Sequence, residues 1–260
     1  MRFALLVARQ RSGTGALGSV LDQHPEIAYL GEVFHPGNAG EETNYFTHLG
    51  RRVAEDPENA MPWRARENFD AFLAAMAARR PGCLLVVDVK YRSLHHLAEG
   101  WQSPVARPWI LQEARRRDAP VLHLTRRNHV ETFVSGRLAE ANRVWHAAEG
   151  TDLAHRSIVV DVRRLSEFIT EAEREAACLG EWLAGHPRCL SWDYSEVFDA
   201  EGLLEAGLAG KIAGMLEVAP PAARRPAFVK QAPRAVGEAV ENIELVRTAL
   251  SGTPHAWMAR

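Results

Sequence analysis

The chain has 260 residues, of which 47% are hydrophobic and 25% charged, enough to bury one substantial core. Its 31 basic and 33 acidic residues leave a net charge of −2, which excludes general electrostatic attraction to nucleic acid or to a membrane surface. No apolar stretch is long enough for a signal peptide or a membrane-spanning helix. We therefore expect a single cytoplasmic domain over residues 1–260 that spans no membrane.

Short apolar runs alternate with longer helical patterns along the chain. Runs of β-branched and aliphatic residues without polar alternation are typical of parallel strands covered on both faces. Strands are predicted at Phe3–Ala8, Ile27–Leu30, Leu84–Val89, Val121–Thr125 and Cys189–Tyr194. Helices are predicted at Thr14–Gln23, Glu67–Arg79, Val105–Arg117, His129–Ala141, Leu165–Leu183, Glu201–Glu217 and Ala235–Leu250. This order predicts the α/β class, with a parallel sheet flanked by helices in a single domain.

Two regions do not fit this pattern. Residues 36–66 are rich in Gly, Pro and charge with scattered aromatic residues, and residues 142–160 are similar in kind. Long irregular segments in a compact domain are often binding loops. A mobile surface insertion without a binding role is the alternative for both.

The first predicted strand leads into a basic, glycine-containing turn and then a helix. The turn reads Arg9-Gln10-Arg11-Ser12-Gly13-Thr14-Gly15. Ligands of open α/β sheets bind beyond the carboxyl ends of the strands, where a helix N-terminus offers unpaired N–H groups. The glycines allow close backbone approach, and the hydroxyls and arginines favour an anion. We predict a phosphate or sulfate site here, with contacts from Arg9, Arg11, Ser12, Gly13, Thr14 and Gly15. An ordinary capped helix start is the alternative.

A second basic segment follows the strand Val121–Thr125. Asn128 is placed to cap the next helix, and Arg127 is followed eight residues later by Ser135. An Arg fork and a Ser hydroxyl suit a second phosphate, whereas the alternative is a salt-bridged Arg and a surface Ser. Two anion sites at the ends of parallel strands suggest a nucleoside with phosphates at both ends.

These segments resemble PAPS-dependent sulfotransferases, especially the bacterial carbohydrate and small-molecule branch; PAPS is 3'-phosphoadenosine 5'-phosphosulfate. The family's 5'-phosphosulfate loop reads roughly [KR]-S-G-T, as in Arg11-Ser12-Gly13-Thr14. Its 3'-phosphate motif has an Arg at a strand end and a Ser eight residues later, as in Arg127 and Ser135. The stretches His24-Pro25, Gly31-Glu32-Val33-Phe34-His35 and Trp192-Asp193-Tyr194-Ser195-Glu196 resemble further segments of the family.

The resemblance implies a P-loop-like sulfotransferase fold, with PAPS as co-substrate, PAP as product and no metal. It implies transfer of a sulfuryl group to a hydroxyl of a carbohydrate or natural-product acceptor, a small molecule or a glycan. Residues 36–66 and 142–160 would be the acceptor-binding loops. In the family a basic C-terminal loop closes over the nucleotide, and Lys230 is the predicted residue, with Arg225 and Arg234 as alternatives.

Sulfuryl transfer needs a group that accepts the acceptor's proton and a group that stabilises the departing phosphate. Glu32, at the end of the second predicted strand, is the predicted general base, and His35 is the alternative. Arg11 and the helix N-terminus are predicted to stabilise the phosphate charge.

Two other functions stay open. The run Leu84–Asp88 resembles a Walker B strand, which would suit a P-loop kinase or NTPase, but the Gly-rich turn lacks the Lys of GxxxxGK[ST]. The second alternative is a non-catalytic domain that binds a phosphorylated or sulfated ligand. The sequence has no common metal-ligand spacing, since His95 and His96 are adjacent rather than one helical turn apart.

Overall fold

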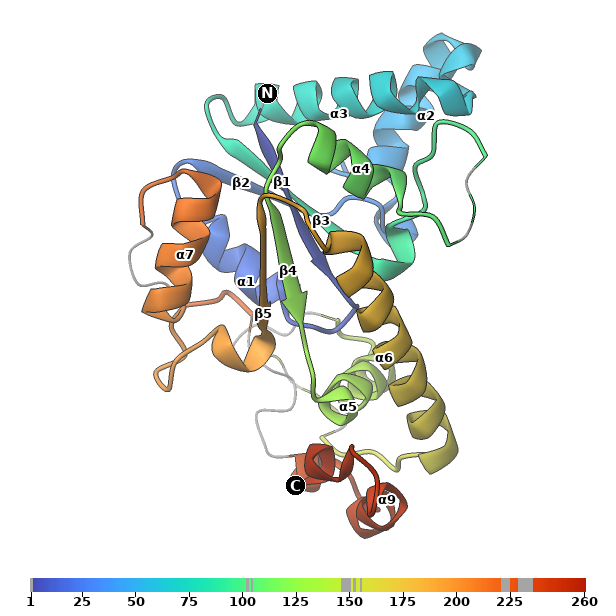
Figure 1. The fold of residues 1–260 in the computed structure, drawn as a ribbon, viewed down its shortest axis with the longest axis vertical. Coiled ribbons are helices and arrows are strands. Elements are labelled where there is room, and N and C mark those ends of the chain that lie inside the picture. Colours follow the sequence, from blue (N-terminus) through green and yellow to red (C-terminus); the bar gives the residue numbers. More distant parts are fainter. Residues whose placement is uncertain are drawn as a thin grey trace.

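The fold is built around a five-stranded sheet in which every pair of neighbouring strands is parallel. The computed structural model describes residues 2–101, 103, 105–145, 151, 153–154, 156–220, 225–228 and 236–260. The strands are β1 (Phe3–Ala8), β2 (Ile27–Glu32), β3 (Leu84–Lys90), β4 (Val121–Thr125) and β5 (Cys189–Asp193). Their order is β2-β3-β1-β4-β5, so the first strand lies at the centre (Figure 1). The predicted α/β class and parallel sheet are confirmed.

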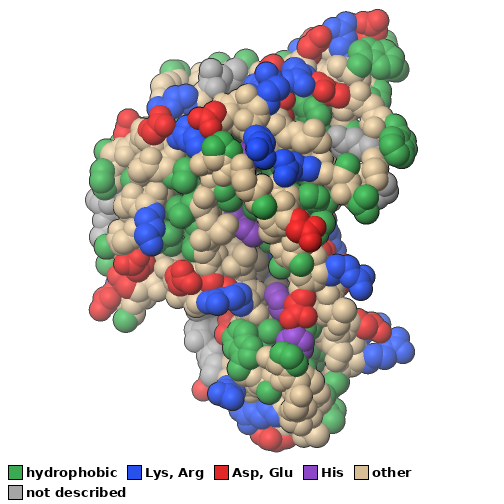
Figure 2. All heavy atoms as spheres, in the orientation of Figure 1, with side chains coloured by type: hydrophobic (Ala, Val, Ile, Leu, Met, Phe, Trp, Pro, Cys, Tyr) green, Lys and Arg blue, Asp and Glu red, His purple; other side chains and the backbone are tan. Residues whose placement is uncertain are grey.

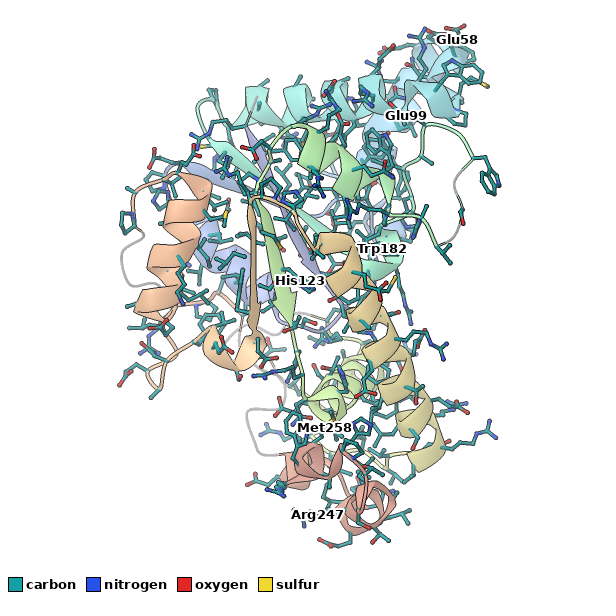
Figure 3. All side chains as sticks on the ribbon, viewed as in Figure 1. Glu58, Glu99, His123, Trp182, Arg247 and Met258 are labelled. Atoms are coloured by element: carbon teal, nitrogen blue, oxygen red, sulfur yellow. The ribbon has the colours of Figure 1, made fainter. Side chains whose placement is uncertain are left out.

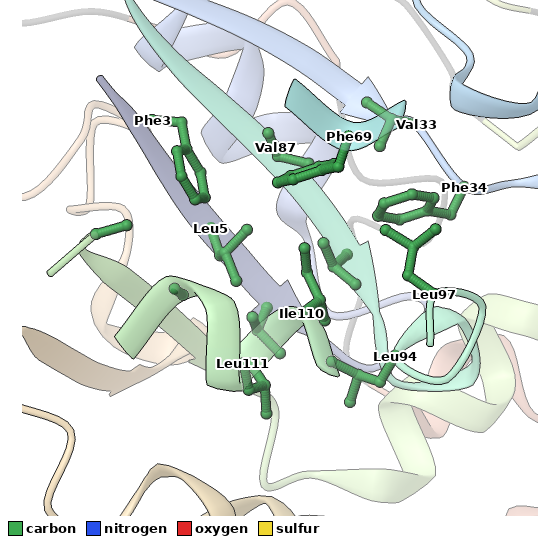
Figure 4. Close-up of a cluster of buried hydrophobic side chains, with 14 of the residues drawn as sticks. Phe3, Leu5, Val33, Phe34, Phe69, Val87, Leu94, Leu97, Ile110 and Leu111 are labelled. Carbon is green, nitrogen blue, oxygen red and sulfur yellow. The ribbon is translucent and has the colours of Figure 1, made fainter. Parts of the chain in front are cut away.

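Helices cover both faces of this sheet (Figure 1). The α-helices are α1 (Thr14–Leu21), α2 (Tyr45–Glu55), α3 (Ala65–Arg79), α4 (Trp109–Arg116), α5 (His129–Asn142), α6 (Val162–Leu183), α7 (Ala206–Leu216), α8 (Val236–Ala239) and α9 (Ile243–Leu250). Successive strand residues point to opposite faces. Phe3 and Leu5 of β1 therefore pack with α3 and α4 on one face (Figure 4), and Ala4 and Leu6 pack with α1 and α7 on the other. A third apolar cluster joins α5, α6, α8 and α9.

Two predicted helices begin later than expected. Helix α4 begins at Trp109 because Pro108 has an extended backbone with ψ 142° and disfavours helical structure before it. Helix α7 begins at Ala206 rather than Glu201 because the Glu205 carboxylate caps it, accepting hydrogen bonds from two first-turn N–H groups.

The predicted C-terminal helix is divided into α8 and α9 within the described residues. Asn242 interrupts it: its side chain accepts a hydrogen bond from Val160 N–H and donates one to Val160 O, both at 2.8 Å. A long-range contact therefore overrides the local helical pattern.

Residues 36–66 are not the irregular loop that their composition suggests. They contain α2 and three short 3₁₀ turns, Pro36–Asn38, Pro57–Ala60 and Pro62–Arg64. The Asn44 side chain caps α2 by accepting from two backbone N–H groups, and Tyr45 is the residue of this helix that is buried. Tyr45, Phe46, Leu49 and Val53 do recur at helical spacing along α2, but the Gly, Pro and charged residues of the surrounding segment concealed this pattern in the sequence.

His123 is an ionisable side chain buried inside the sheet region, on β4 (Figure 3). Its Nε2 lies 2.7 Å from the Tyr91 hydroxyl, and its Nδ1 lies 3.2 Å from the Ser191 hydroxyl. Burial lowers the pKa of His123 to about 4. The neutral imidazole is therefore the form that the fold accepts.

We predict that His123 makes the protein less stable in mild acid. The unfolded chain takes up this proton near pH 6.5, whereas the folded protein takes it up near the lowered pKa. The stabilisation is complete above pH 6.5 and falls by about 3 kcal/mol as the pH approaches 4. Urea denaturation at pH 7, 5.5 and 4.5 measures this loss. The variant His123→Asn should lose less stability between pH 7 and 4.5 than the unaltered protein, and an equal loss would contradict the assignment.

Candidate functional site

The two predicted anion-binding segments lie side by side because β1 and β4 are neighbouring strands. Arg11 comes from the turn after β1, and its Nη2 donates a hydrogen bond to Ser135 Oγ of α5 at 3.0 Å. Its Nε lies 3.3 Å from the same oxygen, and its Nη1 donates to the carbonyl of Trp145 at 2.7 Å. Arg11 and Ser135 are therefore close enough to contact one anionic group together.

The turn that carries Arg11 has an unusual backbone. Gly13 is the N-cap of α1 with φ +90°, and no side chain caps the first-turn N–H groups. A Cβ added to Gly13 would lie 2.1 Å from Cε2 of Tyr194, so glycine is required for this close approach. The N-terminus of α1 therefore has the uncapped backbone predicted for an anion site, and binding of an anion there stays a prediction. Ser12 is buried beside it, and Gly15 lies in the first turn of α1.

Arg126 holds the shape of this turn, a role that the sequence did not reveal. Its Nη1 donates to the carbonyl of Arg11 at 3.0 Å, its Nη2 donates to Glu131 at 2.8 Å, and its guanidinium lies 5.0 Å from the centre of the Tyr194 ring. Burial and the charge of Arg126 lower the pKa of Arg11, and the Glu32 carboxylate acts in the opposite direction. Arg126 and Arg127 are adjacent in the sequence, and the sequence does not indicate which of the two side chains points toward the turn.

The structure places Arg127 at the surface. Its side chain is 70% exposed and lies 3.5 Å from Asp193 and 3.8 Å from Glu196. Its backbone N–H donates to Asp193 at 2.7 Å. Ser135 is therefore paired with Arg11 rather than with Arg127. A 3'-phosphate contact from Arg127 stays a prediction.

Arg9 is paired with carboxylates of α6 in the structure, and a contact from Arg9 to the ligand stays a prediction. Its Nε lies 2.9 Å from Glu175 and its Nη2 3.5 Å from Glu171, both on α6. Its guanidinium lies 4.0 Å from the centre of the Phe168 ring. Burial raises the pKa of Glu175, although Arg9 opposes this shift. Arg9 therefore joins the strand end to α6.

A β-bulge directs Glu32 toward the anion turn. The register of β2 against β3 shifts between Tyr29 and Glu32, and Gly31 in the bulge has φ +69°. Residues three apart in a regular strand point to opposite faces, but the extra residue lets both side chains reach β3 on the same face. Tyr29 contacts Asp88, and Glu32 Oε1 lies 3.4 Å from Lys90 Nζ.

Lys90 is a second site residue that the sequence analysis did not identify. Its ammonium group donates to both carboxylate oxygens of Asp88 at 2.7 Å and to the hydroxyl of Thr14 in the first turn of α1. The sequence did contain a signal for this site: Asp88 and Lys90, two positions apart, end a strand whose other residues are apolar. Buried charges of this kind need partners. Thr14 is therefore bound to β3 through its hydroxyl.

His35 and the basic residues near the C-terminus were also predicted to belong to the site. His35 is exposed, and its Nδ1 accepts a hydrogen bond from Gly37 N–H at 3.0 Å, which caps the turn Pro36–Asn38. The carbonyl of Arg225 accepts from Gln23 at 2.9 Å. Lys230 and Arg234 lie outside the described residues.

Beyond the candidate site, basic and acidic side chains are mixed on the visible surface of the molecule. On the face shown in Figure 2, Lys and Arg side chains are interspersed with Asp and Glu.

Among the described residues, no cluster of three or more His, Cys, Asp or Glu side chains is placed to hold a metal ion. In the same part of the chain, no helix combines the length and apolar character that a membrane crossing requires.

No family model matches the sequence, and no curated protein matches it. Among solved structures, the chain is similar to a sulfotransferase domain from the curacin biosynthetic pathway. The TM-score is 0.45 with 12% sequence identity, over 84% of this chain and 75% of that chain.

We predict that Gly13→Ala destabilises the turn. The new methyl group would meet the Tyr194 ring, and a φ of +90° is unfavourable for alanine. The expected loss is about 1–3 kcal/mol in the free energy of unfolding, measured by chemical denaturation. Gly50→Ala on α2 is the matched control, because a Cβ there meets nothing within 4 Å. Equal stability of the two variants would show that the close approach at Gly13 is not required.

Proposed function

We propose that this protein transfers a sulfuryl group from PAPS to a hydroxyl of a carbohydrate or natural-product acceptor. The observation that carries the proposal is the position of Arg11. Its guanidinium contacts Ser135 of the second anion segment, and Glu32 is near enough to influence its pKa. One cation therefore connects both predicted phosphate-binding segments with the predicted base.

The residues support a direct, in-line transfer. Glu32 would accept the proton of the acceptor hydroxyl while the acceptor oxygen forms a bond to sulfur. The bond between sulfur and the bridging phosphate oxygen breaks, and the electron pair leaves with the phosphate of PAP. The N-terminus of α1 and Arg11 would stabilise that charge. The Lys90 ammonium, paired with Asp88, lies between Thr14 and Glu32.

The contacts of Asp88 disfavour the kinase alternative. In a P-loop kinase or NTPase the corresponding strand aspartate helps to hold Mg²⁺. Here both oxygens of Asp88 are paired with the Lys90 ammonium, and Tyr29 donates to one of them at 2.7 Å. This carboxylate therefore already has a cationic partner within the fold.

We predict metal-independent binding of 3',5'-ADP that is stronger than binding of 5'-AMP or Mg-ATP, because both proposed anion segments would contact this ligand. Isothermal titration calorimetry measures all three. Ser135→Ala and Arg127→Ala should each reduce the preference for 3',5'-ADP over 5'-AMP by about tenfold, the value of one charge-assisted contact. Arg163→Ala, which removes an arginine whose side chain is 87% exposed on α6, is the control. Preferred binding of Mg-ATP would refute the proposal.

We predict that Glu32→Gln binds 3',5'-ADP within about threefold of the unaltered protein but loses at least about 100-fold in transfer from PAPS, the usual contribution of a general base. Transfer of ³⁵S from labelled PAPS to a panel of glycosides and phenols measures turnover. His35→Asn is the companion variant and tests the alternative base. Undiminished turnover in Glu32→Gln would remove Glu32 from that role, and binding without turnover in the unaltered protein would favour a non-catalytic binding domain.

A further inference from the structure

Lysine is rare in this chain, and Lys90 is buried. Only three of the 31 basic residues are lysines, at positions 90, 211 and 230. Lys90 is 3% exposed, although a buried ammonium is costly unless it is paired. An ammonium is a compact point charge with three donors, which suits a small space between several acceptors better than a guanidinium does. The environment of Lys90 therefore shows what this charge is placed to do.

Three acceptors surround the Lys90 ammonium. Asp88 provides both carboxylate oxygens at 2.7 Å, and Thr14 provides its hydroxyl. Glu32 Oε1 is more distant at 3.4 Å, and its side chain is 26% exposed. Two carboxylates thus share one ammonium, and Asp88 holds the shorter contacts. Glu32 is the carboxylate that keeps access to solvent.

Asp88 is itself held in place. It is 1% exposed, it stands two residues before Lys90 on the same face of β3, and it pairs in register with Glu32 of β2. The hydroxyl of Tyr29 donates to its Oδ2 at 2.7 Å. The buried carboxylate is therefore fixed from two sides and cannot move without breaking one of these contacts.

We propose that Asp88 is a positioning residue that keeps Glu32 available as a base. The proposal rests on the proposed sulfuryl transfer. Asp88 neutralises Lys90 and holds the ammonium against Thr14, so that Glu32 is oriented by the ammonium without being tightly paired to it. Without the Asp88 charge, Glu32 would be the remaining carboxylate partner of Lys90. A tight Glu32–Lys90 pair would occupy the oxygen that has to accept the proton of the acceptor.

A double-mutant cycle distinguishes positioning from simple structural support. The variants are Asp88→Asn, Lys90→Met and the combination of both. Asp88→Asn should lower kcat at least tenfold while the Kd for 3',5'-ADP changes by less than threefold. In the Lys90→Met background the same change should cost no further activity, because Asp88 acts through Lys90. Additive losses would overturn the proposal.

A matched control removes a buried carboxylate elsewhere. Glu113 is 2% exposed and accepts hydrogen bonds from Arg116, Arg117 and Arg66, away from the anion turn. Glu113→Gln should lower the stability of the protein as Asp88→Asn does, but kcat per nucleotide-binding site should stay unchanged. An equal fall in kcat would show that loss of any buried carboxylate explains the effect.

A second measurement needs no turnover. Acetic anhydride labels lysine amines, and peptide mass spectrometry gives the rate at each position. Lys90 should react at least tenfold more slowly than the exposed Lys211. Asp88→Asn should keep most of that protection, because Glu32 becomes the partner of the ammonium, whereas Asp88→Asn combined with Glu32→Gln should remove it. Loss of protection in Asp88→Asn alone would overturn the proposal even if sulfuryl transfer is observed. If transfer is absent from the unaltered protein, the proposed function fails, and this labelling still decides whether Lys90 exchanges Asp88 for Glu32.

Discussion

The parallel pairing of β1 with both β3 and β4 is the constraint on which the candidate site depends. Because β1 is central, the turn that leaves its carboxyl end lies between the ends of its two neighbours. Residues from β3 approach this turn from one side, and Arg126 after β4 and Ser135 of α5 approach from the other. Arg11, Lys90 and Ser135 are far apart in the sequence, but the order of the strands brings them to one edge of the sheet.

The site also concentrates buried charged groups at the end of β3. The first residues of β3 are apolar, whereas Asp88 and Lys90 at its end form a hydrogen-bonded pair. An apolar pair of similar volume would often be equally stable or more stable at such a position. A buried charged pair is therefore weak evidence of added stability. Its contacts are consistent with a role in orienting the groups around it.

The architecture and one half of the site could be predicted from the sequence. Buried parallel strands leave continuous apolar runs, and a glycine-containing turn before a helix has its own signature, so the strands and the position of the Arg11 turn followed directly. Helix α2 was missed because Gly, Pro and charged residues dominate the segment around its apolar positions. The inward position of Arg126, the turning of Arg9 toward α6 and the capture of Thr14 by Lys90 depend on tertiary contacts. Local spacing contains no information about these.

The bulge at Gly31 also changes the open edge of the sheet. Strand β2 is at an edge of the sheet, and a regular edge strand is a template on which another chain can add a strand. The register shift between Tyr29 and Glu32 interrupts the row of backbone hydrogen-bonding groups at the point where the strand approaches the site. The irregularity that turns a carboxylate toward the Arg11 turn therefore also interrupts the open edge of the sheet, which makes the addition of another strand there less favourable.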